Sequence, residues 1–228
     1  MQGDIFATKG IEYLIVIGYL LVMVGMVRLF ASKRFARAGE AKTRRPVAHT
    51  APWFSLADGR YFHQGHAWAA PDGGEIVTVG LDDFAARVVG QTDGFVLPAV
   101  GSGVRQGEPA WSVRADGRAL TMLCPVDGTV LAVNPAVIET PRLAADDPYG
   151  RGWLLKVHAP NRQASLRNLF SGELATVWMQ HTAERLRQLP AGELGVVMPD
   201  GGEPVPGFGR VLRPEAWQVI TREFFLTG

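Results

Sequence analysis

Two histidines, His63 and His66, lie three residues apart and come nearest to the spacing of a metal site. Zinc sites take three or four His, Cys or carboxylate ligands, and no third ligand at a recognisable spacing accompanies this pair. We therefore predict that both side chains pack within the fold and bind no metal. The remaining histidines are dispersed and are interpreted as surface or packing residues: His49, His158 and His181.

The single cysteine, Cys124, is the only thiol that could act as a nucleophile. Its apolar neighbours Met122, Leu123 and Val126 predict burial, and a buried thiol without an adjacent base behaves as a small hydrophobe. The chain also lacks a phosphate-binding glycine loop, a haem-attachment motif and a serine nucleophile elbow. We therefore predict a protein that is not an enzyme and holds no cofactor.

Two Asp-Gly pairs, Asp116-Gly117 and Asp127-Gly128, predict tight turns between short apolar runs. Asp-Gly suits a two-residue hairpin turn because both positions must accept positive φ. The first turn would present three charged side chains, Arg114, Asp116 and Arg118, at the tip of a hairpin.

The elements that position these residues are mainly short strands. Between residues 61 and 160, β-branched or apolar runs alternate with Gly, Pro and Asp, which predicts an all-β core. Residues 81–89 (LDDFAARVV) have helical spacing and predict a small inserted helix. Residues 161–189 also have a helical period, and Pro190 ends it.

Residues 190–228 form a C-terminal extension with its own apolar residues. The run LGVVM-PDGGE-PVPGF predicts a hairpin, and Pro214 begins a predicted amphipathic helix. The apolar face of this helix must pack against something, either protein or lipid. We therefore name candidate partner contacts at the tip and in this extension: Arg114, Asp116, Arg118, Trp217, Phe224 and Phe225.

Residues 11–31 (IEYLIVIGYLLVMVGMVRLFA) predict one transmembrane helix, because this length of apolar helix crosses a bilayer core. Residues 1–10 contain one lysine, whereas six basic residues follow the span within residues 32–45. The positive-inside rule then predicts a single-pass protein of a bacterial-type inner (cytoplasmic) membrane, with its N-terminus outside and its soluble domain in the cytoplasm. Gly18 and Gly25 share one face of the span and would allow another membrane helix to approach closely.

Residues 32–60 join the span to the domain as a basic juxtamembrane segment followed by a linker. The formal net charge of +1 conceals the basic run in this segment. Attraction to anionic lipid headgroups, about 1 kcal/mol per basic residue, is a sufficient role for it. We therefore predict the lipid bilayer as a partner and no nucleic acid.

Three segments resemble the H-protein of the glycine cleavage system. Gly65–Trp68 (GHAW) matches the family's His-x-Trp, and Val77–Ala85 (VTVGLDDFA) matches its VTVGITDYA-type segment. Asn134–Val157 (NPAVIETPRLAADDPYGRGWLLKV) matches the C-terminal signature through DPYG-x-GW, in the same order and spacing. The resemblance implies two antiparallel sheets packed as in lipoyl domains, a barrel-sandwich hybrid, with flanking helices.

In that family, a lysine at a hairpin tip carries lipoic acid in amide linkage. Aligning Gly107 to Gly128 without gaps places Gly117 at that position, and a one-residue shift places Arg118 there. Neither residue offers the free amine that lipoylation needs. Arg114 replaces the acidic residue that precedes the family's lysine. The chain's four lysines lie elsewhere: Lys9, Lys33, Lys42 and Lys156.

These observations predict a non-catalytic, membrane-anchored interaction subunit of a larger membrane complex, with other subunits of that complex as partners. Lipoyl ancestry suggests a respiratory or redox complex. The alternative is a glycine cleavage H-type carrier that transfers an aminomethyl or one-carbon group by another means. An enzyme ranks third, and a stand-alone membrane tether for a soluble dehydrogenase would look the same from the sequence.

Overall fold

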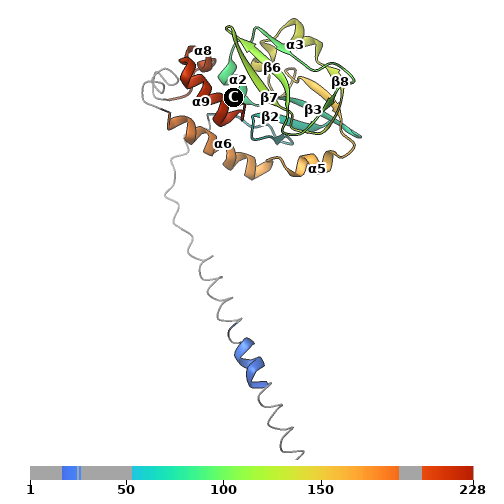
Figure 1. Ribbon diagram of the computed structural model, residues 1–228, viewed down its shortest axis with the longest axis vertical. Helices are drawn as coiled ribbons and strands as arrows, with labels where there is room; N and C mark the ends of the chain where they lie inside the picture. The colour runs from blue at the N-terminus through green and yellow to red at the C-terminus, as the bar shows by residue number, and fades with distance from the viewer. Residues whose placement is uncertain (1–16, 25, 27–52, 190–201, 228) are drawn as a thin grey trace, which may run out of the picture. The chain divides into compact units, whose positions relative to one another are not determined.

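The computed structural model describes residues 17–24, 26, 53–189 and 202–227 (Figure 1). Contacts divide the chain into two units, Met1–Thr50 and Ala51–Gly228. In the first unit, residues 17–24 form an exposed helix that contains Gly18. Among the described residues, no helix is long and apolar enough to cross a membrane. Most of the predicted span 11–31, including Gly25, and the basic segment lie outside the described residues, so the membrane anchor stays a prediction.

The second unit is built on two antiparallel sheets, as the sequence predicted for a mainly β domain with flanking helices. The strands of the larger sheet are, in spatial order, β1 (Tyr61–Phe62), β2 (Ala67–Pro71), β3 (Ile76–Leu81), β9 (Leu155–His158), β8 (Gly128–Val133) and β5 (Gly103–Val104). The smaller sheet contains β4 (Gly94–Val96), β6 (Pro109–Ala115) and β7 (Arg118–Leu123), with β6 in the middle.

The alternation of residues along β6 explains how the smaller sheet faces the core. Trp111, Val113 and Ala115 are buried, whereas Arg114 between them is exposed, as the two-residue period of a strand requires. Val113 pairs with Leu120 of β7, which is also buried. Burying each large apolar side chain contributes about 1.5–3 kcal/mol, so this period fixes the register of the hairpin.

Helices flank the sheets and close the core. The helix expected at residues 81–89 is present as α2, and Asp82 caps it by accepting a hydrogen bond from Ala85 N at 2.8 Å. This cap is one reason why α2 begins where it does. The flanking helices of the second unit up to residue 187 are α2 (Asp83–Val89), α3 (Pro135–Glu139), α4 (Leu143–Asp146), α5 (Arg162–Arg167) and α6 (Gly172–Arg187).

The C-terminal extension packs on the domain through α8 (Phe208–Val211) and α9 (Pro214–Phe224), which lie on the side of α2 (Figure 1). The predicted hairpin differs: its first half lies outside the described residues, and residues 202–207 form bends and a turn. Pro204 and Pro206 cannot donate ladder hydrogen bonds, which opposes a strand there. The large apolar side chains of the extension join the core: Phe208, Leu212, Ile220, Phe224 and Phe225.

The domain begins earlier than the predicted boundary at Tyr61. Trp53 and Phe54 are only 7% and 2% exposed, and the ring of Phe54 lies 5.1 Å from that of Phe84. The Arg187 guanidinium lies 3.9 Å from the Trp53 ring centroid, within cation–π distance. The end of the predicted linker is therefore part of the core, which its lack of an apolar period concealed.

Candidate functional site at the hairpin tip

The β6–β7 hairpin ends in the turn Asp116-Gly117, whose residues have φ of 54° and 73°. Positive φ at both positions is the geometry that the Asp-Gly pair predicted. The backbone N–H of Asp116 donates to Asp93 Oδ2 at 2.6 Å, which ties the turn to the residue before β4. Nothing lies within 4 Å of the position of a Cβ on Gly117. Gly117, the first of the two positions aligned with the family's lysine, is therefore an open apex without a side chain.

Arg118, the second aligned position, is bound to the C-terminal extension. Its Nη1 donates to the carbonyl of Gly209 at 2.7 Å, and its Nη2 donates to the carbonyl of Leu212 at 2.6 Å. Its Cζ lies 5.5 Å from the ring centroid of Trp217. The carbonyls at the end of α8 lack helical partners, and a guanidinium satisfies two of them at once. Arg118 thus connects the hairpin tip to the extension.

Further contacts hold the extension against the hairpin and α2. The hydroxyl of Thr227 donates to the carbonyl of Thr121 on β7 at 3.0 Å, and Gly207 N donates to the carbonyl of Arg87 at 2.6 Å. A Cβ on Gly209 would lie 2.6 Å from the carbonyl oxygen of Val88, so the backbones approach too closely for a side chain. The extension is therefore packed at backbone level.

The predicted partner contacts fall into two groups. Arg114 and Asp116 are exposed at the tip, and Trp217 is half-buried beside Arg118. Phe224 and Phe225, in contrast, are 3% and 0% exposed and pack inside the chain's own core. Their prediction as contacts to another protein is therefore not met in this structure. An amphipathic helix pattern alone does not reveal whether its apolar face packs within the chain or outside it.

A buried pair, His66 and Asp82, lies under the same extension. His66 Nδ1 is 2.7 Å from Asp82 Oδ2, and the two side chains are 1% and 0% exposed. The His66 ring stacks on Phe84 at 4.1 Å and on Trp178 at 4.8 Å, with Phe225 at 5.6 Å. We attribute a packing role to this pair, since the His66 ring lies among aromatic rings from α2, α6 and the extension.

His63 has a separate structural role. Its Nδ1 accepts a hydrogen bond from Gly65 N at 3.0 Å. Burial, followed by the proximity of His66, lowers the pKa of His63 to about 4, so the ring is neutral at neutral pH. Across the described part of the chain, no group of three or more His, Cys, Asp or Glu side chains is placed to hold a metal ion.

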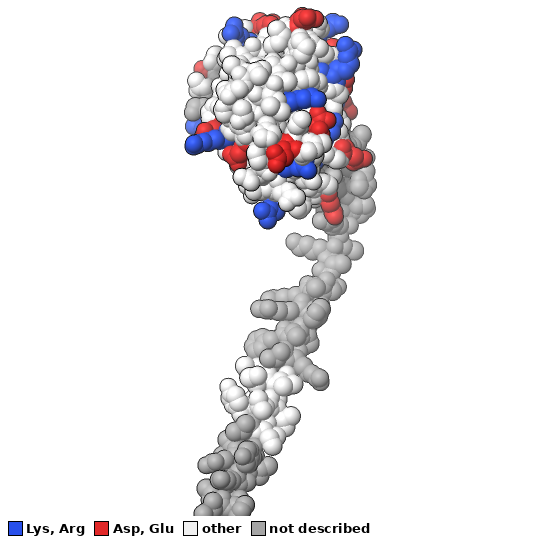
Figure 2. All heavy atoms as spheres, turned by 90° about the vertical axis from the view of Figure 1, so that its right-hand side faces the viewer, with Lys and Arg blue, Asp and Glu red and all other residues white. Residues whose placement is uncertain are grey.

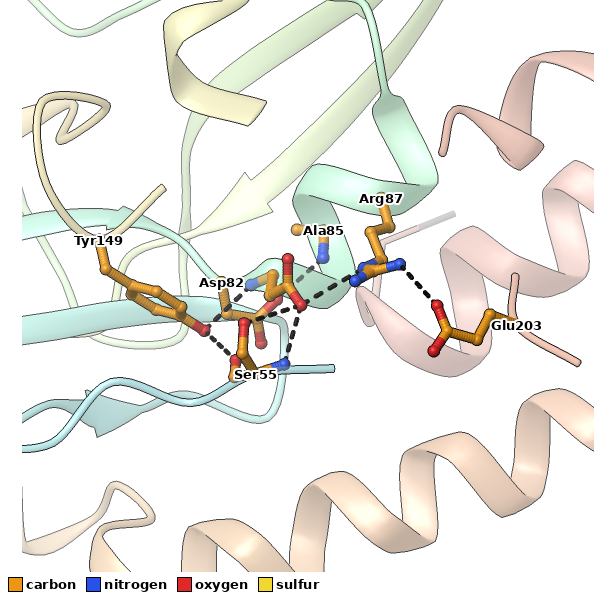
Figure 3. Close-up of polar contacts among 7 residues, drawn as sticks. Ser55, Asp82, Ala85, Arg87, Tyr149 and Glu203 are labelled. Carbon is orange, nitrogen blue, oxygen red and sulfur yellow. Dashed lines mark hydrogen bonds and ion pairs between the residues drawn. The ribbon is translucent and has the colours of Figure 1, made fainter. Parts of the chain in front are cut away.

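The Tyr149 hydroxyl joins segments that lie far apart in the sequence (Figure 3). It donates to the carbonyl of Ser55 at 2.8 Å and accepts from Asp83 N at 3.0 Å. Asp83 Oδ2 also accepts from Ser55 N at 2.8 Å and lies 3.4 Å from Arg87 Nε. Arg87 in turn lies 3.9 Å from Glu203. Burial raises the pKa of Tyr149, so its hydroxyl remains a donor across the ordinary pH range.

Cys124 is buried, as its neighbours predicted. Its thiol donates to the carbonyl of Val126 at 3.2 Å. Burial raises the pKa of Cys124 to about 12, so the thiolate is scarce at neutral pH. This environment suits a packing role.

The family profile described as "Glycine cleavage H-protein" matches residues 60–182, slightly more than half of the chain. The H protein of Crocosphaera subtropica is 41% identical over 98 residues, which cover 43% of this chain and 74% of that protein. The H protein of Carboxydothermus hydrogenoformans is 39% identical over 108 residues, which cover 47% of this chain and 82% of that protein. The chain therefore belongs to the glycine cleavage H-protein family.

A crystal structure of a glycine cleavage system H protein from Mycobacterium marinum is similar with a TM-score of 0.49 and 26% identity, over 56% of this chain and 99% of that chain. The family match ends at residue 182. The extension that binds Arg118 therefore lies outside the part of the chain that the profile matches.

Proposed function

We propose that this chain is a lipoyl-free member of its family that works as a protein-interaction module. The observation that carries the proposal is the state of the hairpin tip. Gly117 offers no side chain, and the Arg118 guanidinium binds two carbonyls of the chain's own extension. Lipoylation requires a lysine amine, and neither aligned position supplies one.

The contacts of the tip also oppose a carrier function. A carrier must present its group to separate partners, which requires a free arm at the position that bears the group. Here Arg118 and Thr121 are hydrogen-bonded to the extension, and Trp217 lies beside Arg118. The extension therefore makes this end of the domain a fixed surface suited to recognition.

We further propose that residues 11–31 anchor this module in a membrane, with the domain in the cytoplasm, as a non-enzymatic subunit of a larger complex. The support is the apolar run and the basic residues that follow it. A respiratory or other redox complex is the proposed setting, and lipoyl ancestry is its only support.

The comparisons favour a second candidate over the membrane-complex role. The named relatives are glycine cleavage system H proteins, and the match includes most of their length. A carrier function here would need to attach its group at a residue other than Gly117 or Arg118. The two candidates therefore differ in one chemical requirement, a covalently bound group.

A reconstituted assay separates the two candidates. The full-length chain in detergent would be the only H-type protein in a mixture of a lipoylating enzyme and the other glycine cleavage components, and glycine decarboxylation would be measured. We expect no activity above a mixture without the chain. The Thermobifida fusca H protein, 41% identical over 101 residues, is the positive control. Activity comparable with that control would overturn the proposal and establish the carrier function.

The membrane proposal needs its own test. Gentle detergent extraction from the native membrane, followed by mass spectrometry of the co-purifying chains, should yield membrane subunits in stoichiometric amounts. Extraction without detergent, or recovery of the chain alone, would contradict the complex-subunit role. Neither result bears on the proposal of a lipoyl-free module, which the decarboxylation assay tests.

A further inference from the structure

The domain has residues beyond both ends of its family-matched region, residues 60–182. The entry segment, residues 53–55, precedes the match, whereas the end of α6 and the C-terminal extension follow it. The entry segment and the extension both pack on α2, and the end of α6 contacts both of them. Charged and uncharged side chains alternate over the face of the domain in Figure 2, so these packed segments are more informative than a surface patch.

The ring of Phe84, on α2, contacts both of these segments. Phe54 of the entry segment lies 5.1 Å from it in an edge-to-face arrangement, and Phe224 of α9 also lies 5.1 Å away. Phe225 lies at 5.8 Å. All four side chains are at most 3% exposed. Neither the entry segment nor the extension can therefore leave without uncovering the ring of Phe84.

Polar contacts along α2 link the same two segments (Figure 3). Asp83 Oδ2 accepts hydrogen bonds from the backbone N–H of Ser55 at 2.8 Å and from its hydroxyl at 3.1 Å. The same oxygen lies 3.4 Å from Nε of Arg87, whose guanidinium lies 3.9 Å from Glu203. The carbonyl of Arg87 accepts from Gly207 N at 2.6 Å. Asp83 and Arg87 thus hold the entry segment and the extension, one helical turn apart.

The end of α6 contacts both segments from another side. The Arg187 guanidinium lies 3.9 Å from the ring centroid of Trp53. Arg185 Nη2 donates to Glu223 Oε2 at 3.0 Å, and Arg185 Cζ lies 5.2 Å from the ring centroid of Phe224. These contacts join three parts of the chain outside the family match, which we call the terminal unit: residues 53–55, 183–187 and 202–227.

The contacts of the terminal unit are shared, so their energies depend on one another. Displacing the entry segment would remove one neighbour of Phe84 and two hydrogen bonds of Asp83, which weakens the surface on which the extension packs. Residues that share a contact have non-additive effects on stability. Segments that share buried contacts tend to open together as one cooperative part of a fold.

We infer that the entry segment and the extension form one cooperative unit, which docks on α2 and opens as a whole. Arg118 is held by two carbonyls of the extension, so opening of this unit also releases the hairpin tip. The segment that leads from residues 11–31 into the domain thus controls the tip. The inference goes beyond the proposed function and depends neither on the absence of lipoyl nor on a membrane.

Native-state hydrogen exchange of the full-length chain in detergent, resolved by peptide mass spectrometry, tests the inference. Phe54→Leu removes the aromatic contact with Phe84 and keeps an apolar side chain. We expect exchange in residues 207–225 to accelerate at least about fivefold, together with exchange in the entry segment. Asp83→Ala, which releases Ser55, should accelerate the same two segments and replaces the first variant if that variant fails to fold.

The reverse experiment uses Phe225→Leu in the extension. Coupling between two sites is reciprocal, so exchange in the entry segment should accelerate by a similar factor. The matched control is Phe62→Leu, at a side chain 1% exposed that belongs to a separate apolar cluster with Trp68 and Ala70. In this control, exchange in residues 207–225 should stay within about twofold of the parent chain.

Chemical labelling reports on the hairpin tip. Modification of Arg118 by phenylglyoxal, located by mass spectrometry, should be faster in Phe54→Leu and unchanged in Phe62→Leu, because only the first substitution releases the guanidinium. Faster exchange confined to the substituted segment, in either Phe54→Leu or Phe225→Leu, would overturn the inference. An equal acceleration of the extension in Phe62→Leu, or a uniform acceleration throughout the domain, would also overturn it.

Discussion

The signature loop at residues 146–153 and the β6–β7 hairpin tip differ in what they retain from the family. The loop keeps the DPYG-x-GW pattern, and its carbonyls have partners: Trp68 Nε1 donates to Pro148 at 3.0 Å, and Asn134 Nδ2 donates to Trp153 at 2.7 Å. The tip has no lysine, and Arg118 binds an extension that lies outside the family match. Motifs of the family's fold are present in this chain, whereas neither Gly117 nor Arg118 supplies a lysine amine.

This contrast limits what family membership implies. The motifs that identify the family, such as Gly65–Trp68 and the signature loop, act in packing here. Their presence therefore supports the fold more directly than the carrier chemistry. The following variants test how much the tip, the extension and the residues around them contribute to the stability of the domain.

The largest effect is expected from Phe225→Ala. Phe225 is fully buried against His66 and Phe84, and removing its ring leaves a cavity that costs about 3–5 kcal/mol in the free energy of unfolding. Val211→Ala, at a side chain 60% exposed, is the control and should change stability by less than about 0.5 kcal/mol. Chemical denaturation measures both values. Equal, small effects would mean that the extension is dispensable to the fold.

Acid should destabilise the domain through His63. Its pKa is about 4 in the folded chain, against an ordinary value of 6.5 for an exposed histidine, so the unfolded chain binds more protons between these pH values. Stability should therefore be complete above pH 6.5 and fall by about 3 kcal/mol as the pH is lowered to 4. Denaturation at several pH values measures this slope, and His63→Gln should make it shallower. An unchanged slope in the variant would assign the acid sensitivity to other groups.

Arg118→Ala removes the side-chain contacts that connect the tip to the extension. Loss of two charge-assisted hydrogen bonds and the contact with Trp217 should lower the free energy of unfolding by about 2 kcal/mol. This value is smaller than the sum of the separate bonds, because the Arg118 side chain is partly exposed. Arg114→Ala, at an exposed position on the same strand pair, should cost less than about 0.5 kcal/mol. Thermal or chemical denaturation compares them. Similar losses of unfolding free energy in the two variants would show that the contacts of Arg118 with the extension add no more stability than an exposed side chain does.

The smallest effect is expected from Gly117→Lys, which restores an amine at the apex. The space is open, but a φ of 73° is unfavourable for lysine, so we expect a cost of about 1 kcal/mol. Gly117→Asn should cost less, because asparagine tolerates this conformation. We also expect no lipoylation, since Arg114 and Arg118 keep the tip basic. Efficient lipoylation of the lysine variant would show that the amine is the only feature the tip lacks.

Much of the fold was predictable because it depends on local patterns. Short β-branched and apolar runs separated by Gly, Pro and Asp indicated the strands, the apolar spacing of residues 81–89 indicated α2, and Asp116-Gly117 indicated the turn. Pro214 marked the beginning of α9. These signals act within a few residues, which is the range over which a sequence pattern can be read.

The contacts that define the candidate site were not predictable in the same way. His66 and Asp82 are 16 positions apart, and Arg118 and Gly209 are 91 apart. A sequence gives the types of such residues but not which of them meet. For the same reason, the sequence left open whether the apolar face of α9 packs on protein or on lipid. It named Phe224 and Phe225 as candidate partner contacts, whereas both pack in the chain's own core.

The absence of a lipoyl group is tested most directly by the intact mass of the full-length chain purified from its native source. We predict the mass of the unmodified sequence, because neither Gly117 nor Arg118 can carry a lipoyl amide. A mass increased by a lipoyl or other carrier group, localised by fragmentation to one residue of the chain, would contradict it and restore the carrier function.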